Sequence, residues 1–576
     1  MSVQVSRAVP LKEQSGDARP SVNRSGFDLR TGIYSSVFQL TDHLKVPTDP
    51  DLGIASFVLS QFPHPHVAES KLALIDSATN QHLTYAQLHR SIRSLAGGLY
   101  HLGVRKGDVV FLLSPNSLLY PTICLAVFSI GAILSTANPI NTSSEIAKQV
   151  LDSGAKLVIS TPEELHKFER IQVPTMVTSR QSKEGNPLSI EELIECGDTH
   201  EVPEIKIKQS DTAAVLYSSG TTGTSKGVIL THSNLITTSR LVRWYAEGTS
   251  SVNDVFLGFI PFFHIYGLVF FGFGLSCCGI TTVLMQRFDF QEMLKAIQVH
   301  KVNNIAAVPP VVLGLVKNCK SNDSLSSVRR IGSGAAPLSK ELSEAFRAQF
   351  PWVELRQGYG LTESCGAATV FLSAEMAKAH PGSCGSLLPT FSAKVVDMET
   401  GLGLPPYKEG ELWLKGPTIM KGYLGNEEAT AATLDKDGWL KTGDLGYFDE
   451  DGLLYIVDRV KELIKHNGYQ VAPAELEALL LSHPNILDAA VIPWVPIAME
   501  VVEDEESGQI PMAYVVKAVD SELTQEQVIQ FVAAQVAPYK KVRRVEFIDV
   551  IPKSAAGKIL RKQLILQSQR PILSKL

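Results

Sequence analysis

The sequence lacks the paired cysteines that would indicate a disulfide framework or a zinc site. Its seven cysteines are odd in number and include no Cys-x-x-Cys spacing. Cys277 and Cys278 are neighbours, but they stand in an apolar run, where cysteine usually packs as a small buried hydrophobe. The cysteines therefore predict a reducing or mixed interior compartment.

The sequence also lacks a block of positive charge, a secretory signal and an unbroken membrane span. Its net charge is −6 over 576 residues, and no stretch concentrates Lys and Arg, which argues against a nucleic-acid partner. The first thirty residues contain no apolar stretch. Two apolar segments remain, Leu118–Ala137 and Leu257–Met285, and Pro261 with His264 interrupts the second. We expect buried helices and strands there and no transmembrane segment.

The chain is too long for a single hydrophobic core. Apolar runs rich in Val, Ile and Leu alternate with helical patterns, which predicts an α/β fold with a large N-terminal domain of layered sheets and helices and a small α+β C-terminal domain. The predicted parts are a flexible N-terminal arm over 1–50, the large domain over 51–459, the small domain over 460–567 and a tail over 568–576. In the small domain we predict helices over Pro473–Ser482 and Gln525–Val536, and strands over Ala489–Pro493 and Met512–Val516.

The strongest local motif is the ten-residue segment from Ser218 to Gly227. It contains six hydroxyl side chains, three glycines and one lysine, Lys226, and it lies between two apolar runs typical of strands, Ala213–Leu216 and Val228–Leu230. Glycine lets backbone N–H groups approach an anion, the hydroxyls add donors, and the lysine adds positive charge. We therefore predict a loop that binds a polyphosphate.

Two other interpretations of this segment are weaker. It is not a Walker A loop, because no Gly-Lys-Ser/Thr closes it at the required spacing. A flexible linker would share its composition, but linkers seldom stand between two apolar strands with a single lysine. The phosphate loop is therefore favoured.

Six further segments follow this loop in order. Together with it they resemble the signature motifs of the adenylate-forming superfamily of acyl-CoA synthetases and luciferases, and above all the plant 4-coumarate:CoA ligases and their peroxisomal relatives. The segments are Pro261–Gly267, Gly334–Leu338, Gln357–Glu363, Thr442–Asp444, Asp458–Lys465, and Pro552–Ser554 with Gly557–Lys558. The resemblance covers nearly the whole chain.

The resemblance implies an ATP-dependent carboxylic acid:CoA ligase. Such an enzyme forms an acyl-AMP intermediate and pyrophosphate, and then passes the acyl group to the thiol of coenzyme A. Since the acid and the phosphate are both anions, the site needs cations and Mg²⁺. A luciferase-like oxygenase of the same superfamily and a catalytically inactive relative are the alternatives. The second is disfavoured by the intact Lys226, Glu363, Asp444 and Lys558.

The resemblance also implies roles for single residues. Residues 51–459 are expected to bind ATP and the acid, with Glu363 on Mg²⁺, Tyr359 stacked on adenine, and Asp444 on the ribose. The expected ATP- and AMP-binding residues are Ser218, Ser219, Gly220, Thr221, Thr222, Lys226, Ala335, Gln357, Gly358, Tyr359, Thr362, Asp444, Arg459, Lys461 and Gln470.

The small domain is expected to act as a lid. The family lysine that matches Lys558 bridges the substrate carboxylate and the nucleotide, so the domain must close for adenylation and rotate, about Lys461, for thiol transfer. The expected catalytic residues are Lys558, His264 and Lys465, and the residues that match coenzyme A contacts are Arg287, Asn467 and Gly468. Asn467 replaces a lysine common in the family, which removes one charge.

Tyr266, Phe270 and Gly332 match positions of the acyl pocket. Phe270 stands where 4-coumarate ligases often carry a small or polar residue, and Gly332 where they often carry a lysine near the phenol hydroxyl. The polar end of the pocket is thus expected to be lost, and an unpartnered phenol hydroxyl would cost about 1–3 kcal/mol. We expect a cinnamate-like, fatty or oxylipin (jasmonate-precursor) acid rather than 4-coumarate.

Two segments near the C-terminus carry further predictions. The last three residues, Ser574, Lys575 and Leu576, spell the address that a peroxisomal import receptor reads, so we predict a peroxisomal protein. Residues 494–507 are longer than the short acidic turn usual in the family. They form either a harmless surface loop or a disturbance of the small domain.

Overall fold

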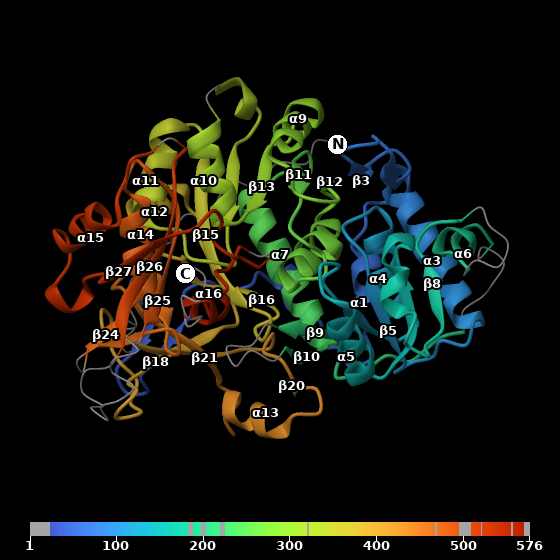
Figure 1. Cartoon of the computed structure of the whole chain (residues 1–576). Coiled ribbons are helices and arrows are strands. Elements are labelled where there is room, and N and C mark those ends of the chain that lie inside the picture. The colour runs from blue at the N-terminus through green and yellow to red at the C-terminus, as the bar shows by residue number, and fades with distance from the viewer. Residues whose placement is uncertain are drawn as a thin grey trace.

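The computed structural model describes residues 24–181, 188–196, 203–218, 225–319, 322–466, 469–494, 509–519, 521–554 and 557–568 (Figure 1). Strands and helices alternate along these ranges, and the strands form five sheets within them. The predicted α/β class is confirmed. Figure 1 shows α14 (Pro473–Leu481), α15 (Gln525–Ala533) and the strands between Ile486 and Phe547, orange to red, at one side of the molecule, and α3 (Tyr85–His101) and β8 (Thr175–Val177) at the opposite side.

Two large sheets make up most of the molecule. The nine-stranded sheet has the order β17-β16-β15-β14-β13-β11-β12-β3-β4, with β17 (Ser386–Leu387) and β4 (His82–Thr84) at its edges. The seven-stranded sheet has the order β20-β10-β9-β6-β5-β7-β8. The inner strands of the first sheet run parallel, and they are β3 (Leu72–Asp76), β12 (Thr281–Leu284), β11 (Val255–Gly258), β13 (Asn304–Ala307), β14 (Arg330–Ser333) and β15 (Glu354–Leu361). Strands in such a sheet are buried on both faces, which explains the apolar sequences of β3 and β11, whereas β14 and β15 carry polar residues as well.

The seven-stranded sheet contains the strands that flank the predicted phosphate loop. β9 (Thr212–Ser218) and β10 (Lys226–Thr231) pair antiparallel, and Lys226 stands opposite Ser218. Both ends of the loop are therefore fixed next to each other, while residues 219–224 lie outside the described residues. The other strands of this sheet are β5 (Val109–Leu113), β6 (Ile133–Thr136), β7 (Ala155–Ser160), β8 (Thr175–Val177) and β20 (Gly422–Tyr423).

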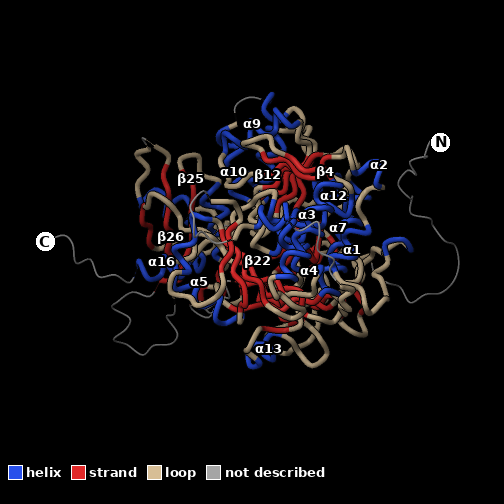
Figure 2. The backbone as a smooth tube through the Cα atoms, turned by 90° about the vertical axis from the view of Figure 1, so that its right-hand side faces the viewer, coloured by secondary structure: helices blue, strands red, loops and turns tan. Residues whose placement is uncertain are grey.

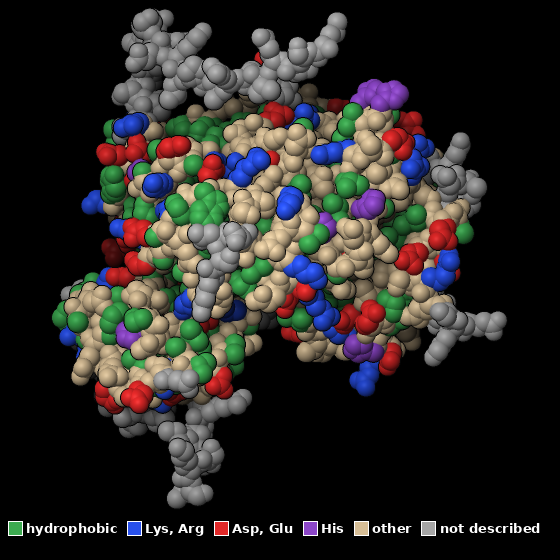
Figure 3. Space-filling model, turned by 90° about the horizontal axis from the view of Figure 1, so that it is seen from above, with side chains coloured by type: hydrophobic (Ala, Val, Ile, Leu, Met, Phe, Trp, Pro, Cys, Tyr) green, Lys and Arg blue, Asp and Glu red, His purple; other side chains and the backbone are tan. Residues whose placement is uncertain are grey.

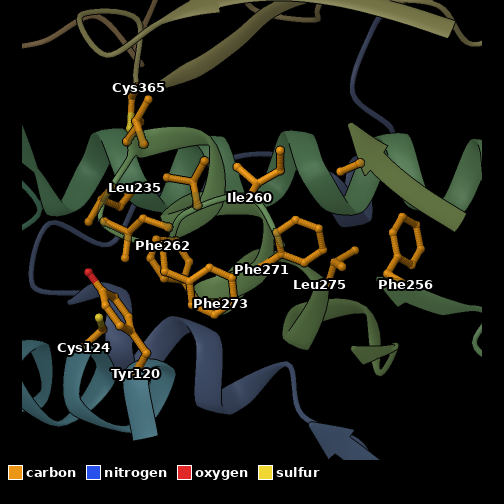
Figure 4. Packing of buried hydrophobic residues seen from close by; sticks show 14 of the residues in the cluster. Tyr120, Cys124, Leu235, Phe256, Ile260, Phe262, Phe271, Phe273, Leu275 and Cys365 are labelled. Atoms are coloured by element: carbon orange, nitrogen blue, oxygen red, sulfur yellow. The ribbon is translucent and has the colours of Figure 1, made fainter. Parts of the chain in front are cut away.

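The apolar segments at Leu118–Ala137 and Leu257–Met285 form the interior. The first contains α4 (Leu119–Ser129), and the second contains a π-helical turn, η4 (Leu268–Gly274), that packs against α7 (His232–Thr249). Phe262, Phe271 and Phe273 meet in this core, with Phe262 and Phe271 stacked at 5.9 Å between ring centroids (Figure 4). Among the described helices, none has both the length and the apolar character needed to cross a membrane.

The predicted flexible arm over 1–50 is wrong for the part from Phe27 to Leu44. β1 (Phe27–Asp28) and β2 (Ile33–Ser35) join the edge of a six-stranded sheet of order β1-β2-β18-β19-β21-β22. Tyr34 is fully buried, donates its hydroxyl to Leu404 O at 3.0 Å and stacks on Phe448 at 4.4 Å. The strands are too short to give a periodic pattern, and their partners lie far along the chain. Residues 1–23 lie outside the described residues.

After β22 (Leu454–Arg459) the chain builds a separate small core. A hairpin, β23 (Ile464–His466) with β24 (Tyr469–Val471), precedes the three-stranded sheet β25 (Ile486–Trp494), β26 (Ile510–Lys517) and β27 (Arg544–Phe547). α14 (Pro473–Leu481) and α15 (Gln525–Ala533) pack on it. These elements match the predicted helices and strands to within a few residues, whereas residues 495–508 lie outside the described residues.

Figure 2 shows groups of strands, in red, running through the molecule with helices, in blue, beside them. The remaining larger elements are α1 (Ile54–Ser60), α3 (Tyr85–His101), α5 (Ser143–Ser153), α9 (Phe290–His300), α10 (Pro309–Asn318), α11 (Lys340–Gln349), α12 (Ala374–Ala379), α13 (Glu427–Thr433), α16 (Arg561–Ser568), β16 (Gly366–Val370), β18 (Ser392–Val396), β19 (Gly410–Lys415) and β21 (Leu440–Phe448). On the face in Figure 3, basic and acidic side chains are interspersed, as the small net charge predicts.

Candidate active site

Glu363 is the centre of a cluster at the foot of the predicted phosphate loop. Its Oε1 accepts hydrogen bonds from Ser218 Oγ and from the hydroxyl of Tyr423, each at 3.0 Å. Lys226 Nζ lies 4.7 Å from the centroid of the Tyr423 ring. The structure thus brings together Ser218, Lys226 and Glu363, which the sequence predicts, while the predicted Ser219, Gly220, Thr221 and Thr222 lie outside the described residues.

Sequence reasoning missed Tyr423. It belongs to β20, a strand of only two residues, whose Tyr423 stands opposite Val228 of β10. No local pattern marks such a short strand, and its partners are distant in the sequence.

The cluster around Glu363 fits Mg²⁺. Among the described residues no group of three or more His, Cys, Asp or Glu side chains could hold a metal ion. Mg²⁺ does not need such a group, because it usually keeps several waters and is bound by one or two carboxylates and by substrate phosphates. One carboxylate with neighbouring hydroxyls, beside a lysine and the ends of a phosphate loop, is the donor set that this mode requires.

Asp444 is the centre of a second cluster. Its Oδ2 accepts a hydrogen bond of 2.6 Å from the hydroxyl of Tyr359, and its Oδ1 lies 3.4 Å from Arg459 Nε. β21 and β22 create this pair, because Asp444 stands opposite Arg459 in their register. Burial raises the pKa of Asp444, and the positive charges of Arg459 and Lys558 oppose that shift.

The segments Gly334–Leu338 and Gln357–Glu363 follow or end the parallel strands β14 and β15. Ligands of parallel sheets usually bind at the carboxyl ends of the strands. Gln357 joins the two segments, since its Oε1 accepts a hydrogen bond of 3.3 Å from Leu338 N. Ala335, which lines a cavity, adopts a positive φ of 69°. Gly358 leaves no room for a side chain, because a Cβ would lie 3.0 Å from Thr369 O. Thr362 is buried nearby.

Lys558 reaches the Asp444 cluster from the small domain. Its Nζ lies 3.7 Å from Glu462 Oε1, and Asp444 is close enough to favour its charged form. Burial lowers the pKa of Lys558, and the neighbouring Arg459 lowers it further. The small domain is closed on the large one in this structure.

Two contacts hold the closed arrangement. Gly557, with φ of 78°, packs so tightly on α10 that a Cβ there would lie 3.2 Å from Pro310. Lys317 of the same helix donates hydrogen bonds to Ile486 O and Leu487 O at 2.9 and 3.0 Å.

Several predicted residues stand away from these clusters. Lys465 and Gln470 are opposite each other in the β23–β24 hairpin, and both are exposed. Lys461 is exposed beside the hairpin, and Arg287 is exposed after β12. Asn467 and Gly468 lie outside the described residues, so the roles expected for these positions stay predictions.

A cavity lies between the nine-stranded sheet and the helical segments α7 and η4. The predicted acyl residues Tyr266, Phe270 and Gly332 line it, as does His264, which is expected to be catalytic. At one end the cavity reaches Ala335, Gln357, Gly358 and Tyr359 of the predicted nucleotide site. The predicted acyl pocket and the predicted nucleotide site are therefore continuous.

His264 lies in the wall of this cavity. Its Nδ1 accepts a hydrogen bond of 3.3 Å from Tyr266 N, and burial lowers the pKa of His264 to about 4. The imidazole is therefore uncharged near neutral pH, and it can form hydrogen bonds in the cavity wall without contributing a positive charge.

The surface that lines the cavity is mainly apolar. Gly332 offers no polar side chain, and a Cβ there would meet nothing within 4 Å. Asn304, Arg330 and Arg356, from neighbouring strands that no motif marks, also stand in the wall. The expected loss of the polar end of the pocket stays a prediction.

Comparison with known proteins places these features in a family. Residues 64–424 match the AMP-binding enzyme family, and residues 475–558 match the AMP-binding enzyme C-terminal domain. The chain is 44% identical to Peroxisomal OPC-8:0-CoA ligase 1 of Arabidopsis thaliana over 554 residues, which are 95% of this chain and 98% of that protein. It is 44% identical to Probable CoA ligase CCL5 of Humulus lupulus over 94% of this chain and 97% of that protein.

Solved structures agree. ATP-bound MatB from Rhodopseudomonas palustris superposes with a TM-score of 0.79 at 26% identity, covering 90% of this chain and 99% of that one. O-succinylbenzoate coenzyme A synthetase (MenE) from Bacillus subtilis, in complex with ATP and magnesium ion, superposes with a TM-score of 0.75 at 30% identity, covering 88% of this chain and 98% of that one.

The chain belongs to the AMP-binding enzyme family, the adenylate-forming enzymes that the motifs indicate. Within that family it is an ATP-dependent, AMP-forming acid–CoA ligase, similar to the 4-coumarate:CoA ligase-like proteins of plants.

Proposed function

We propose that the chain converts a hydrophobic carboxylic acid into its CoA thioester through an acyl adenylate, and that the acid is cinnamate-like, fatty or an oxylipin rather than 4-coumarate. The observation that carries the proposal is the continuity of the buried cavity with Tyr359, whose hydroxyl is bonded to Asp444, beside Lys558. An acid in the cavity would present its carboxylate at the nucleotide end. The relative named Peroxisomal OPC-8:0-CoA ligase 1 supports an oxylipin among these acids.

Different residues would have different roles in adenylation. Asp444 and Arg459 would hold the ribose, and Tyr359 would lie against adenine. Lys558 would bring positive charge to the point where the carboxylate meets the α-phosphate, in a site from which the closed domain excludes water. Mg²⁺ at Glu363 would neutralise the phosphates of ATP and of the departing pyrophosphate.

Thiol transfer requires the second arrangement of the lid. We propose that residues 460–567 rotate about Lys461, which carries Lys558 away from Asp444 and brings Lys465 and Gln470 towards the adenylate. Arg287, Asn467 and Gly468 would then contact coenzyme A. Rotation must break the hydrogen bonds from Lys317 to the carbonyl groups of Ile486 and Leu487.

The test is an assay of the purified full chain with ATP, Mg²⁺, coenzyme A and a panel of acids. Thioesters are identified by mass spectrometry, and pyrophosphate release is followed in parallel. We expect a thioester from cinnamic or fatty acids and a lower kcat/KM for 4-coumarate than for cinnamate. A clear preference for 4-coumarate would overturn the substrate proposal, and the failure of every acid to release pyrophosphate would overturn the function.

We also propose that the enzyme works in peroxisomes. The proposal depends on Ser574, Lys575 and Leu576, which lie outside the described residues, and the peroxisomal relative supports it. A fluorescent protein fused to the N-terminus should accumulate in peroxisomes. The same fusion without the last three residues should stay in the cytosol, and an unchanged distribution would contradict the proposal.

A further inference from the structure

We propose that Glu462, held in place by Arg561, is a positioning residue that fixes the ammonium group of Lys558 at the nucleotide site while the adenylate forms. Glu462 then acts on adenylation through Lys558 and not by contact with the acid or with ATP. This inference rests on the proposed function, because it concerns the step that Lys558 serves.

The main chain of Lys558 is fixed by a turn. Lys558 N donates a hydrogen bond of 3.2 Å to Ser554 Oγ, and Lys558 O accepts one of 2.8 Å from Ser554 N. The ammonium group, however, stands at the end of a flexible four-carbon stem, which the turn does not hold. A contact that keeps the ammonium in one place therefore has to come from another residue.

Glu462 supplies that contact. Lys558 Nζ lies 3.7 Å from Glu462 Oε1, and this is the one ion pair that the ammonium makes within the described ranges. The two side chains are only 27% and 20% exposed. Salt and water screen a partly buried pair much less than a pair on the surface, so the carboxylate attracts the ammonium effectively.

Arg561 fixes the carboxylate of Glu462. Its Nη1 donates a hydrogen bond to Glu462 Oε2. Its other nitrogen atoms are used as well, since Nη2 donates to both oxygens of Glu477 at 2.8 Å and Nε donates to Val491 O at 3.1 Å. Only 12% of the Arg561 side chain is exposed. One oxygen of Glu462 is thus bound to a fixed group, and the other faces Lys558.

Two further carboxylates face Arg561. Glu477 binds it through both oxygens, and the negative charge of Asp458 also favours its charged form. Asp458 Oδ2 accepts a hydrogen bond of 2.9 Å from Ala474 N as well. Neither carboxylate is paired with Lys558 in the part of the chain that the structure describes, so Glu462 alone connects Arg561 to Lys558.

The charges around Lys558 show what a carboxylate does at this position. Burial lowers the pKa of Lys558, and the positive charges of Arg459 and Arg561 lower it further. The negative charges of Glu462 and Asp444 oppose that shift. Asp444 is already paired with Arg459, with 3.4 Å between Oδ1 and Nε. Glu462 is therefore the carboxylate that both holds the ammonium and favours its charged form.

Glu462 belongs to the lid. It directly follows Lys461, about which we propose that the lid rotates, and Arg561 and Lys558 lie in the same domain. The three side chains would therefore move together, whereas Asp444 stays with the large domain. Loss of Glu462 should affect the half-reaction in which Lys558 meets the nucleotide, which is adenylation, and should spare thiol transfer.

The experiment follows both half-reactions of Glu462→Gln between about pH 6 and about pH 10. Glutamine retains an oxygen for Arg561 and removes the charge beside Lys558. Without coenzyme A, pyrophosphate release from ATP, Mg²⁺ and the acid that the parent chain activates fastest should fall by about tenfold near neutral pH. The alkaline decline of this rate should begin about one pH unit lower than in the parent chain, because removal of a negative charge lowers the pKa of Lys558. Thiol transfer from a supplied acyl adenylate should stay within about twofold of the parent rate.

Three comparisons connect the effect to Lys558. Glu462→Asp keeps the charge on a shorter side chain, so adenylation should be slower while its pH profile follows that of the parent chain. In Lys558→Ala, the addition of Glu462→Gln should change the remaining rate by less than about twofold, because the two residues act as a unit. Glu475→Gln is the matched control, since Glu475 pairs with Lys540 at 2.7 Å elsewhere in the small domain, and it should change neither the rate nor the profile.

The outcomes separate this inference from the function. A rate and a pH profile of Glu462→Gln like those of the parent chain overturn the inference. So does an equal loss in both half-reactions, or a loss of about tenfold that persists in the Lys558→Ala background. Should Glu462→Gln not fold, as thermal unfolding shows, the comparison of the two half-reactions in Glu462→Asp decides in its place. Pyrophosphate release by the parent chain leaves the ligase function in place in all these cases, whereas its failure with every acid refutes the function itself.

Discussion

The hydroxyl of Tyr359 donates a hydrogen bond of 2.6 Å to Oδ2 of Asp444. The bond joins the Gly-Tyr-Gly segment of the nine-stranded sheet to the Thr-Gly-Asp segment of the six-stranded sheet. Two motifs that are separated along the chain thereby become the walls of one site. The phenol also positions a carboxylate that burial would otherwise favour in its protonated form, because burial raises the pKa of Asp444.

Tyr359→Phe removes this hydrogen bond and keeps the aromatic ring. We expect the KM for ATP to rise by about tenfold or more with little change in kcat, because a hydrogen bond to a charged group contributes about 1.5–3 kcal/mol, although Arg459 still holds Asp444. Tyr359→Ala, which also removes the ring, should raise it further. Steady-state assays over a range of ATP concentrations measure both, and equal effects of the two variants would contradict a role for the ring.

Lys558→Ala should affect the two half-reactions differently. The rate of adenylation, measured as pyrophosphate release, should fall by about 100-fold or more. The reason is that the variant lacks the positive charge beside the α-phosphate, where negative charge develops as the acid attacks. Thiol transfer from a supplied acyl adenylate should be largely retained. Lys562→Ala, an exposed lysine on the following helix, is the control and should leave both half-reactions intact. Equal loss of both halves would exclude the two-position lid.

Glu363→Gln keeps the size of the side chain and removes its charge. We expect the Mg²⁺ concentration needed for half-maximal adenylation to rise by about tenfold or more, because the amide is a weaker ligand for Mg²⁺. Tyr423→Phe, which removes only one hydrogen bond to Glu363, should give a much smaller shift. A Mg²⁺ dependence of Glu363→Gln like that of the parent chain would place the metal elsewhere.

His232 makes the stability of the large domain depend on pH. It is fully buried, its Nδ1 accepts a hydrogen bond of 3.1 Å from Ile54 N, and burial lowers its pKa to about 4. Below the ordinary histidine value of about 6.5 the unfolded chain takes up a proton that the folded chain does not, so stability is lost as pH falls from about 6.5 to about 4. At about pH 5 the loss is about 2 kcal/mol.

The variant His232→Gln retains an acceptor and cannot titrate. Its melting temperature should therefore fall less than that of the parent chain between about pH 7 and about pH 5. Differential scanning fluorimetry at both values measures this. Parallel pH curves for the two proteins would show that His232 does not contribute.

Features that depend on neighbours in the sequence could be predicted, and contacts between distant segments could not. The composition of the run from Ser218 to Lys226 indicates a phosphate-binding loop, and the two strands predicted on either side of it are present as β9 and β10. Lys558 is recognisable from its Gly-Lys turn, although only the fold shows that it reaches Asp444. Tyr34 and Tyr423 stand in strands of two or three residues, which are too short for a pattern.

The wall of the predicted acyl cavity shows the same limit. A motif marks position 332, but Asn304, Arg330 and Arg356, which also line the cavity, come from three adjacent strands and belong to no motif. Their common face is a property of the parallel register. Side chains that meet across strands in this way carry no joint signal in a single sequence.

The contact between Lys317 and the small domain has a consequence for which residues can change. The ammonium group binds two main-chain carbonyl groups, of Ile486 and Leu487, and reads neither side chain. A change of the exposed Leu487 side chain would therefore leave the contact in place, whereas Ile486 is fixed by its own burial in the core of the small domain. On this side, the lid presents its main chain, and the large domain supplies the side chain that recognises it.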